Sequence, residues 1–204
     1  MKTNAKDTVT EPREVEPFDR INLRGYGRLI VTQGEEVGLT VEARETILPH
    51  IVTEVKDGEL VIRMERGWWE GLIATLRNPR VVYRATVREL TALRIPGAGR
   101  VQVSDIEAER LTLRLPGAGD VEVTGLTAEE LDVELPGTGN LRLTGRVAQQ
   151  RATLGGAGNA TVRVSETLDA RISGVGHIAY YGDPEVTSKV TGLGSIQRAE
   201  EAAS

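Results

Sequence analysis

The chain has 204 residues and a formal net charge of −5 at pH 7, with 39% hydrophobic and 27% charged residues. These values are typical of a globular chain with its own core, and the acidic balance disfavours nucleic-acid binding. The lack of cysteine excludes disulfides, thiolate metal sites and cysteine nucleophiles. Glycine is frequent, with 23 residues, which indicates a turn-rich fold.

The chain opens with a polar segment. Residues 1–16 have no hydrophobic centre of the kind that an export signal needs, so we expect a disordered leader there. No stretch reaches the roughly 18 apolar residues of a membrane-spanning helix. Two locations stay open from these residues: the cytoplasm, or an extracytoplasmic site reached with a signal that has since been removed.

Residues 17–79 are expected to form an antiparallel or mixed β cap. Asp57-Gly58 separates two alternating runs within residues 51–64, which predicts a hairpin with a type I′ turn. Further strands are expected near residues 21–31 and 39–43. Such a cap would cover the open end of a repetitive sheet, where unpaired backbone edges promote aggregation.

A glycine-containing repeat dominates residues 80–198. Its six copies are LRIPGAGR, LRLPGAGD, VELPGTGN, ATLGGAGN, ARISGVGH and SKVTGLGS. Successive copies are 18 to 20 residues apart, and INLRGYGRLIV (21–31) carries the same pair of glycines. Apolar and polar residues alternate inside each copy, as at Leu111, Leu113 and Leu115, which indicates strands joined by glycine corners.

A unit of this length fits one coil of a β-solenoid, in which equivalent residues stack about 4.8 Å apart. Two columns of the alignment are apolar throughout and are predicted to form the core. Two places before the first glycine stand Ile95, Leu115, Leu135, Leu154, Ile172 and Val190. Four places after it stand Val101, Val121, Leu141, Ala160, Ile178 and Ile196. Residues 17–198 are therefore expected to be one structural domain, followed by a charged tail at 199–204.

The sequence resembles the bacterial family of auto-transporter adhesin head domains, also called GIN domains, whose function is unknown. The resemblance rests on FDRINLRGYGRLIV (18–31), KDGEL (56–60), LTALRIPGAG (90–99) and the glycine units that follow. It implies a right-handed parallel β-helix of the pectin-lyase type and a periplasmic or cell-surface location. It implies no established enzymatic activity.

The outward columns show no catalytic, cofactor or metal site. A polysaccharide lyase on this fold would need carboxylates stacked on neighbouring coils to hold calcium, with a basic residue beside them. The column five places before the glycine instead places Arg151 between Asp132 and Asp169. We therefore expect a non-enzymatic protein without cofactors.

The column three places after the glycine is expected to be a structural turn ladder. It reads Arg100, Asp120, Asn140, Asn159 and His177. Stacked asparagines can exchange amide hydrogen bonds, and Arg100 can pair with Asp120.

Both tryptophans, Trp68 and Trp69, lie between two glycines in a locally basic stretch. Adjacent strand residues face opposite ways, so at least one indole is expected outside the core. The candidate partner or oligomer contact therefore comprises Trp68, Trp69, Arg63, Arg66, Arg77, Arg80 and Arg84. The alternative is that a tryptophan plugs the end of the β-helix.

The leading hypothesis is a non-enzymatic surface or envelope domain that binds a protein or surface glycan and forms a homo-oligomer. The alternatives are a polysaccharide-acting enzyme on a lyase-like β-helix and a cytoplasmic self-assembling scaffold. No nucleic-acid partner and no direct membrane insertion are expected.

Overall fold

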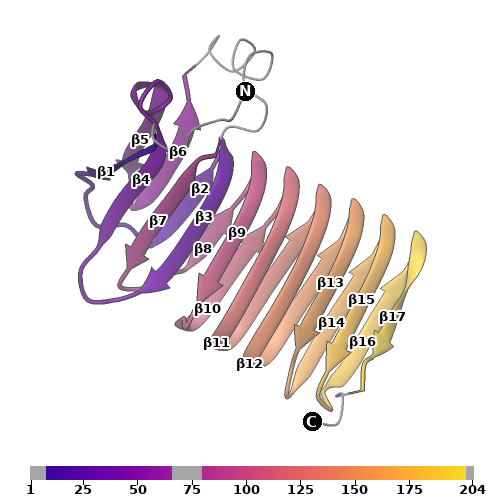
Figure 1. Cartoon of the computed structure of the whole chain (residues 1–204). Helices are drawn as coiled ribbons and strands as arrows, with labels where there is room; N and C mark the ends of the chain where they lie inside the picture. Colours follow the sequence, from indigo (N-terminus) through magenta and orange to yellow (C-terminus); the bar gives the residue numbers. More distant parts are fainter. Residues whose placement is uncertain (1–7, 66–79, 201–204) are drawn as a thin grey trace.

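The computed structural model describes residues 8–65 and 80–200. They form a β-solenoid whose coils stack along one axis, with an antiparallel cap at the N-terminal end (Figure 1). The fold is thus the predicted all-β parallel β-helix with an N-terminal β cap. Within the described ranges, no helix has the length and apolar character needed to cross a membrane.

Strands of successive coils pair into two faces. We call them the β10 face and the β9 face. In spatial order, the β10 face contains β5 (Ile51–Lys56), β6 (Glu59–Met64), β2 (Arg20–Leu23), β8 (Ala92–Arg94), β10 (Glu107–Arg114), the second halves of β11 (Ala118–Leu135) and β12 (Thr138–Leu154), β14 (Thr167–Ile172) and β16 (Glu185–Val190). The β9 face contains β1 (Thr8–Arg13), β4 (Gly38–Arg44), β7 (Val82–Val87), β3 (Tyr26–Gln33), β9 (Ala98–Ser104), the first halves of β11 and β12, β13 (Ala157–Arg163), β15 (Val175–Tyr181) and β17 (Leu193–Arg198).

The N-terminal strands do not stack in chain order. β2 pairs in parallel with both β6 and β8, and β3 pairs in parallel with both β7 and β9. The β2–β3 segment is therefore a coil inserted between two coils that come later in the chain. It lies within the range expected to be a cap, and the antiparallel elements are β1, β4 and β5. β1 falls within residues 1–16, where a disordered leader was expected, because it pairs with β4.

The hairpin at the end of the cap has the predicted turn. β5 and β6 pair antiparallel around Asp57 and Gly58, which have φ of 49° and 76°. Positive φ at both central residues is the requirement of a type I′ turn. A short 3₁₀ helix, η2 (Leu48–His50), leads into β5.

The two predicted apolar columns form the core. Their members on the inner coils expose 5% or less of their surface, for example Leu115, Leu135 and Leu154. Strand registers stack them directly, with Val133 to Leu135 opposite Ala152 to Leu154. The exception is the last coil, where Val190 is 43% exposed because no further coil covers it.

Glycine corners fix the distance between coils. A Cβ placed on Gly137 would lie 2.0 Å from the carbonyl oxygen of Gly117, and one placed on Gly117 would lie 1.9 Å from that of Gly97. The same collision recurs along the whole row, so each corner rests on the backbone of the previous one. Lack of room for a side chain, more than conformational freedom, explains the repeated Gly-x-Gly.

One polar residue interrupts an apolar column. Gln150 stacks between Leu131 and Leu168 and exposes only 3% of its surface. Neither its amide nitrogen nor its oxygen has a hydrogen-bond partner within the described part of the chain. Burying unpaired polar atoms in this way destabilises a fold.

We expect Gly137→Ala to lower the free energy of unfolding by about 1–3 kcal/mol, because the new methyl group must displace the neighbouring corner. Gly38→Ala is the control, since no atom lies within 4 Å of a Cβ at Gly38. That variant is expected to keep or slightly raise the stability. Chemical denaturation followed by circular dichroism measures both, and equal losses would contradict the stacking constraint.

We expect Gln150→Leu to raise the free energy of unfolding by about 1–3 kcal/mol, because it removes an unpaired buried amide and continues a leucine column. Gln149→Leu, at the exposed neighbouring position, should change stability by less than about 0.5 kcal/mol. Urea titration of the two variants separates the free-energy cost of the buried, unpaired amide from any general effect of an added leucine. A destabilised Gln150→Leu variant would show that the amide is satisfied in solution.

Candidate functional site

An open hollow of about 900 Å³ lies on the β9 face next to the cap. Among the charged side chains that line it are four arginines, Arg28, Arg80, Arg84 and Arg100, and one acidic residue, Glu42. All four arginines are exposed. A basic hollow on a chain of net charge −5 is suited to an anionic group, because the local field differs in sign from that of the whole molecule.

The coil register places two of these arginines side by side. β3 and β9 align Gly27 with Gly99, and therefore Arg28 with Arg100. Like charges directly opposite one another disfavour strand pairing. An anion placed between two such side chains would reduce their repulsion.

Neighbouring side chains hold two of the guanidinium groups in place. Arg28 Nε donates a hydrogen bond to Gln102 Oε1 at 3.0 Å, and Arg84 Nη2 lies 3.4 Å from Glu42 Oε2. Arg80 and Arg100 have no ion-pair partner among the residues that the structure describes. Two arginines are thus oriented by the protein, and two more can turn toward a ligand.

A tyrosine at the edge of the hollow stays neutral. Burial raises the pKa of Tyr26 to about 12, against a smaller lowering effect of Arg44. Behind it, burial also raises the pKa of Tyr83, whose hydroxyl donates to the Tyr26 carbonyl oxygen at 3.3 Å. Tyr26 is therefore protonated at neutral pH and adds no negative charge to the arginine hollow.

The structure separates the residues of the predicted partner contact. Arg80 and Arg84 line the hollow, whereas Arg63 lies on β6 in the β10 face, with its Nε 3.6 Å from Glu54 Oε1. The remaining members lie outside the described residues: Arg66, Trp68, Trp69 and Arg77.

Arg28 was not among the predicted site residues. RGYGR and PGAGR carry arginine at the same place after the two glycines, so the shared glycine pair already placed Arg28 and Arg100 in one column. The sequence did not show that their two coils are neighbours. The insertion of the β2–β3 coil next to β9 makes this alignment a contact.

The predicted turn ladder continues from Arg100 along the β9 face. Asn140 Nδ2 donates to Asp120 Oδ1 at 2.9 Å, and Asn159 Nδ2 donates to Asn140 Oδ1 at 3.0 Å. The backbone N–H of His177 donates to Asn159 Oδ1 at 3.2 Å. Arg100 and Asp120 are register neighbours but form no ion pair in the described structure. These contacts are exposed and join adjacent coils.

A second concavity, of about 630 Å³, crosses the β10 face and contains the column considered for a lyase. Its lining carries two arginines and four acidic residues, and part of this charge is paired: Arg110 lies 2.7 Å from Glu130, and Arg151 lies 3.6 Å from Asp169. Burial raises the pKa of Asp132, and Arg151 opposes this effect. No three metal-binding side chains gather anywhere in residues 8–65 and 80–200. The arginine hollow is therefore the stronger candidate site.

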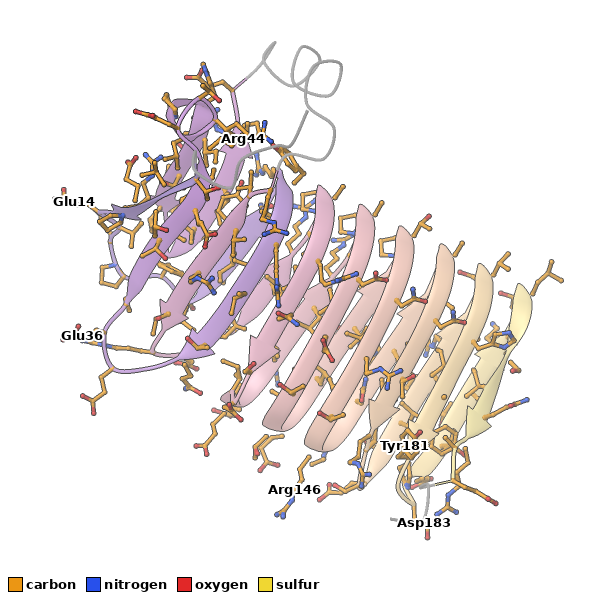
Figure 2. All side chains as sticks on the ribbon, viewed as in Figure 1. Glu14, Glu36, Arg44, Arg146, Tyr181 and Asp183 are labelled. Carbon is orange, nitrogen blue, oxygen red and sulfur yellow. The ribbon has the colours of Figure 1, made fainter. Side chains whose placement is uncertain are left out.

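Side chains project outward from the coils in rows along the solenoid (Figure 2). The molecule is thus a capped parallel β-solenoid with its polar groups displayed on the outer faces. A family model described as "putative auto-transporter adhesin, head GIN domain" matches residues 17–160 and 151–184. The chain belongs to this family, which confirms the resemblance inferred from the repeat.

Solved structures share the fold. A putative adhesin from Bacteroides fragilis is 23% identical, with a TM-score of 0.80, and the match covers 96% of this chain and 98% of that one. A putative lipid binding protein from Parabacteroides distasonis is 20% identical, with a TM-score of 0.60 and the same coverage. A putative adhesin from Parabacteroides merdae is 15% identical, with a TM-score of 0.57, again over 96% and 98% of the two chains. Comparison with curated protein sequences gives no match.

We expect Leu135→Ala to cost about 2–5 kcal/mol of unfolding free energy, because it opens a cavity in the core. Asn140→Ala should cost about 1 kcal/mol or less, because its hydrogen bonds face water. Thermal melts of the two variants provide the comparison. Equal shifts in melting temperature would contradict the assignment of Leu135 to the core and Asn140 to an exposed ladder.

Proposed function

We propose that the chain is a non-enzymatic, extracytoplasmic adhesion-type domain that binds acidic groups on a surface glycan through the arginine hollow. The observation that carries this proposal is the pair Arg28 and Arg100, held side by side on adjacent coils with Arg80 and Arg84 around them. The family, described by its adhesin head domain, supports a role in adhesion and a location outside the cytoplasm.

The chemistry of the hollow favours carboxylates as the recognised groups. Guanidinium groups present forked donors that match a carboxylate with two hydrogen bonds. A polymer of acidic sugars repeats this group along its length, so several units can contact the arginines at once. The open shape of the hollow admits a chain that continues beyond it.

Binding can be tested with polygalacturonate as the probe and neutral dextran as the comparison polymer. The chain is expected to bind polygalacturonate and not dextran, more weakly as salt is added. Arg28→Ser/Arg100→Ser should weaken binding by at least about tenfold, since a hydrogen bond to a charged group contributes about 1.5–3 kcal/mol. Calorimetry measures these affinities.

The matched control is Arg110→Ser/Arg114→Ser, which removes the same charge from the β10 face. Its arginines pair with Glu130 and Glu134, away from the hollow. This variant should retain affinity within about twofold. The charges that it loses contribute only a long-range attraction to the polymer, and salt screens that attraction. Equal losses in both double variants would contradict a localised site. Shortening of the polymer, with or without calcium, would favour the lyase alternative instead.

A further inference from the structure

The two ends of the solenoid differ in how their strand edges are protected. At the N-terminal end, β1 and β5 run antiparallel to the strands beneath them. β1 contains Pro12, which has no backbone donor. Proline on an edge strand is a typical device against further pairing.

At the C-terminal end, the described residues up to 200 include no such cap. β16 pairs only with β14, and β17 only with β15, so the outer edges of both strands are free among the described residues. All six residues of β16 are exposed. This last coil is the yellow end of the solenoid in Figure 1, close to the labelled Tyr181 and Asp183 in Figure 2.

Exposed apolar side chains concentrate at the same end. Among the described residues, five large apolar side chains are exposed, and four of them belong to the last two coils. They are Val175 (54%), Val186 (36%), Val190 (43%) and Leu193 (73%). Val186 and Val190 continue the columns of Leu168 and Ile172, so the core itself is left open here.

We propose that this open end binds a second copy of the same chain, end to end, through antiparallel pairing of β16 with β16. The charges of β16 are self-complementary for such a two-fold contact. If each Thr187 faces its counterpart, Glu185 of each chain lies opposite Lys189 of the other. Both residues are an even number of positions from Thr187, so the charged pairs lie on one side of the new sheet.

The same pairing covers Val186 and Val190 and satisfies the free backbone groups of β16. Since a two-fold contact uses the same end of both molecules, the assembly closes as a dimer. The protected N-terminal edges oppose head-to-tail growth into a filament. This interface lies at the far end of the solenoid from the arginine hollow, and the proposal does not depend on glycan binding.

Charge reversal tests the register in the full chain. Glu185→Lys and Lys189→Glu should each weaken dimerisation by about tenfold, because each creates two like-charged pairs across the strands. The double variant Glu185→Lys/Lys189→Glu should restore the dimer, since the pairs re-form with the signs exchanged. Light scattering and sedimentation over a dilution series measure the association. Arg28→Ser/Arg100→Ser should dimerise normally.

A single introduced cysteine gives an independent test, because the chain has none of its own. Paired residues of antiparallel strands have Cα atoms about 4.5–5.5 Å apart, within the range of a disulfide. Thr187→Cys should therefore form a covalent dimer under mild oxidation. Thr127→Cys, at an exposed position in the middle of the solenoid, is the matched control and should stay monomeric.

Three results would overturn the proposal. A monomer throughout the dilution series would mean that a second copy does not occupy the open end. Open-ended higher oligomers would mean head-to-tail stacking. The third result has two parts: the charge-swapped double variant does not recover dimerisation, and Thr187→Cys and Thr127→Cys crosslink equally. Together they would mean that copies associate through another surface.

Discussion

The close stacking of backbone at the glycine corners is the constraint on which the rest of the structure depends. At each corner the carbonyl oxygen of one coil occupies the space that a Cβ of the next coil would need. The corners therefore align glycine on glycine, and the residues on either side of a corner are placed by counting from it. Differences in coil length are taken up at the far bend, as in the register shift between Val123 and Leu126. Because side chains alternate along a strand, this single alignment fixes both the apolar columns inside and the polar rows outside.

This alignment has opposite consequences for different residue types. It stabilises the exposed ladder from Asp120 to His177, whose members exchange hydrogen bonds between coils. It also places Arg28 opposite Arg100 in the strand register and Gln150 in a leucine column, and both placements are unfavourable. The two arginine side chains are exposed, so an anionic ligand can reach them. The unpaired amide of Gln150 is buried, and no ligand can reach it in the described structure.

Much of this could be predicted from the sequence because the repeat supplies its own alignment. The core columns, the alternation, the corners and the Asp57-Gly58 hairpin all follow from local patterns. The position of the β2–β3 coil did not follow, because it depends on pairing between segments far apart in the chain. For the same reason the arginine hollow was only half recognised: Arg80 and Arg84 belong to one basic stretch, whereas Arg28 and Arg100 meet only in the folded chain.

If the chain dimerises through its open end, the arrangement of the two ends links assembly to adhesion. The arginine hollow lies beside the capped end, and the self-complementary edge lies at the opposite end. A dimer joined at its open ends would carry one hollow at each extremity, with the stiff solenoid setting the distance between them. Two sites on one rigid rod can engage a repetitive acidic polymer, or two neighbouring surfaces, with an avidity well above that of a single hollow. In such a dimer the exposed edge of the last coil joins two hollows, whereas a monomer carries only one.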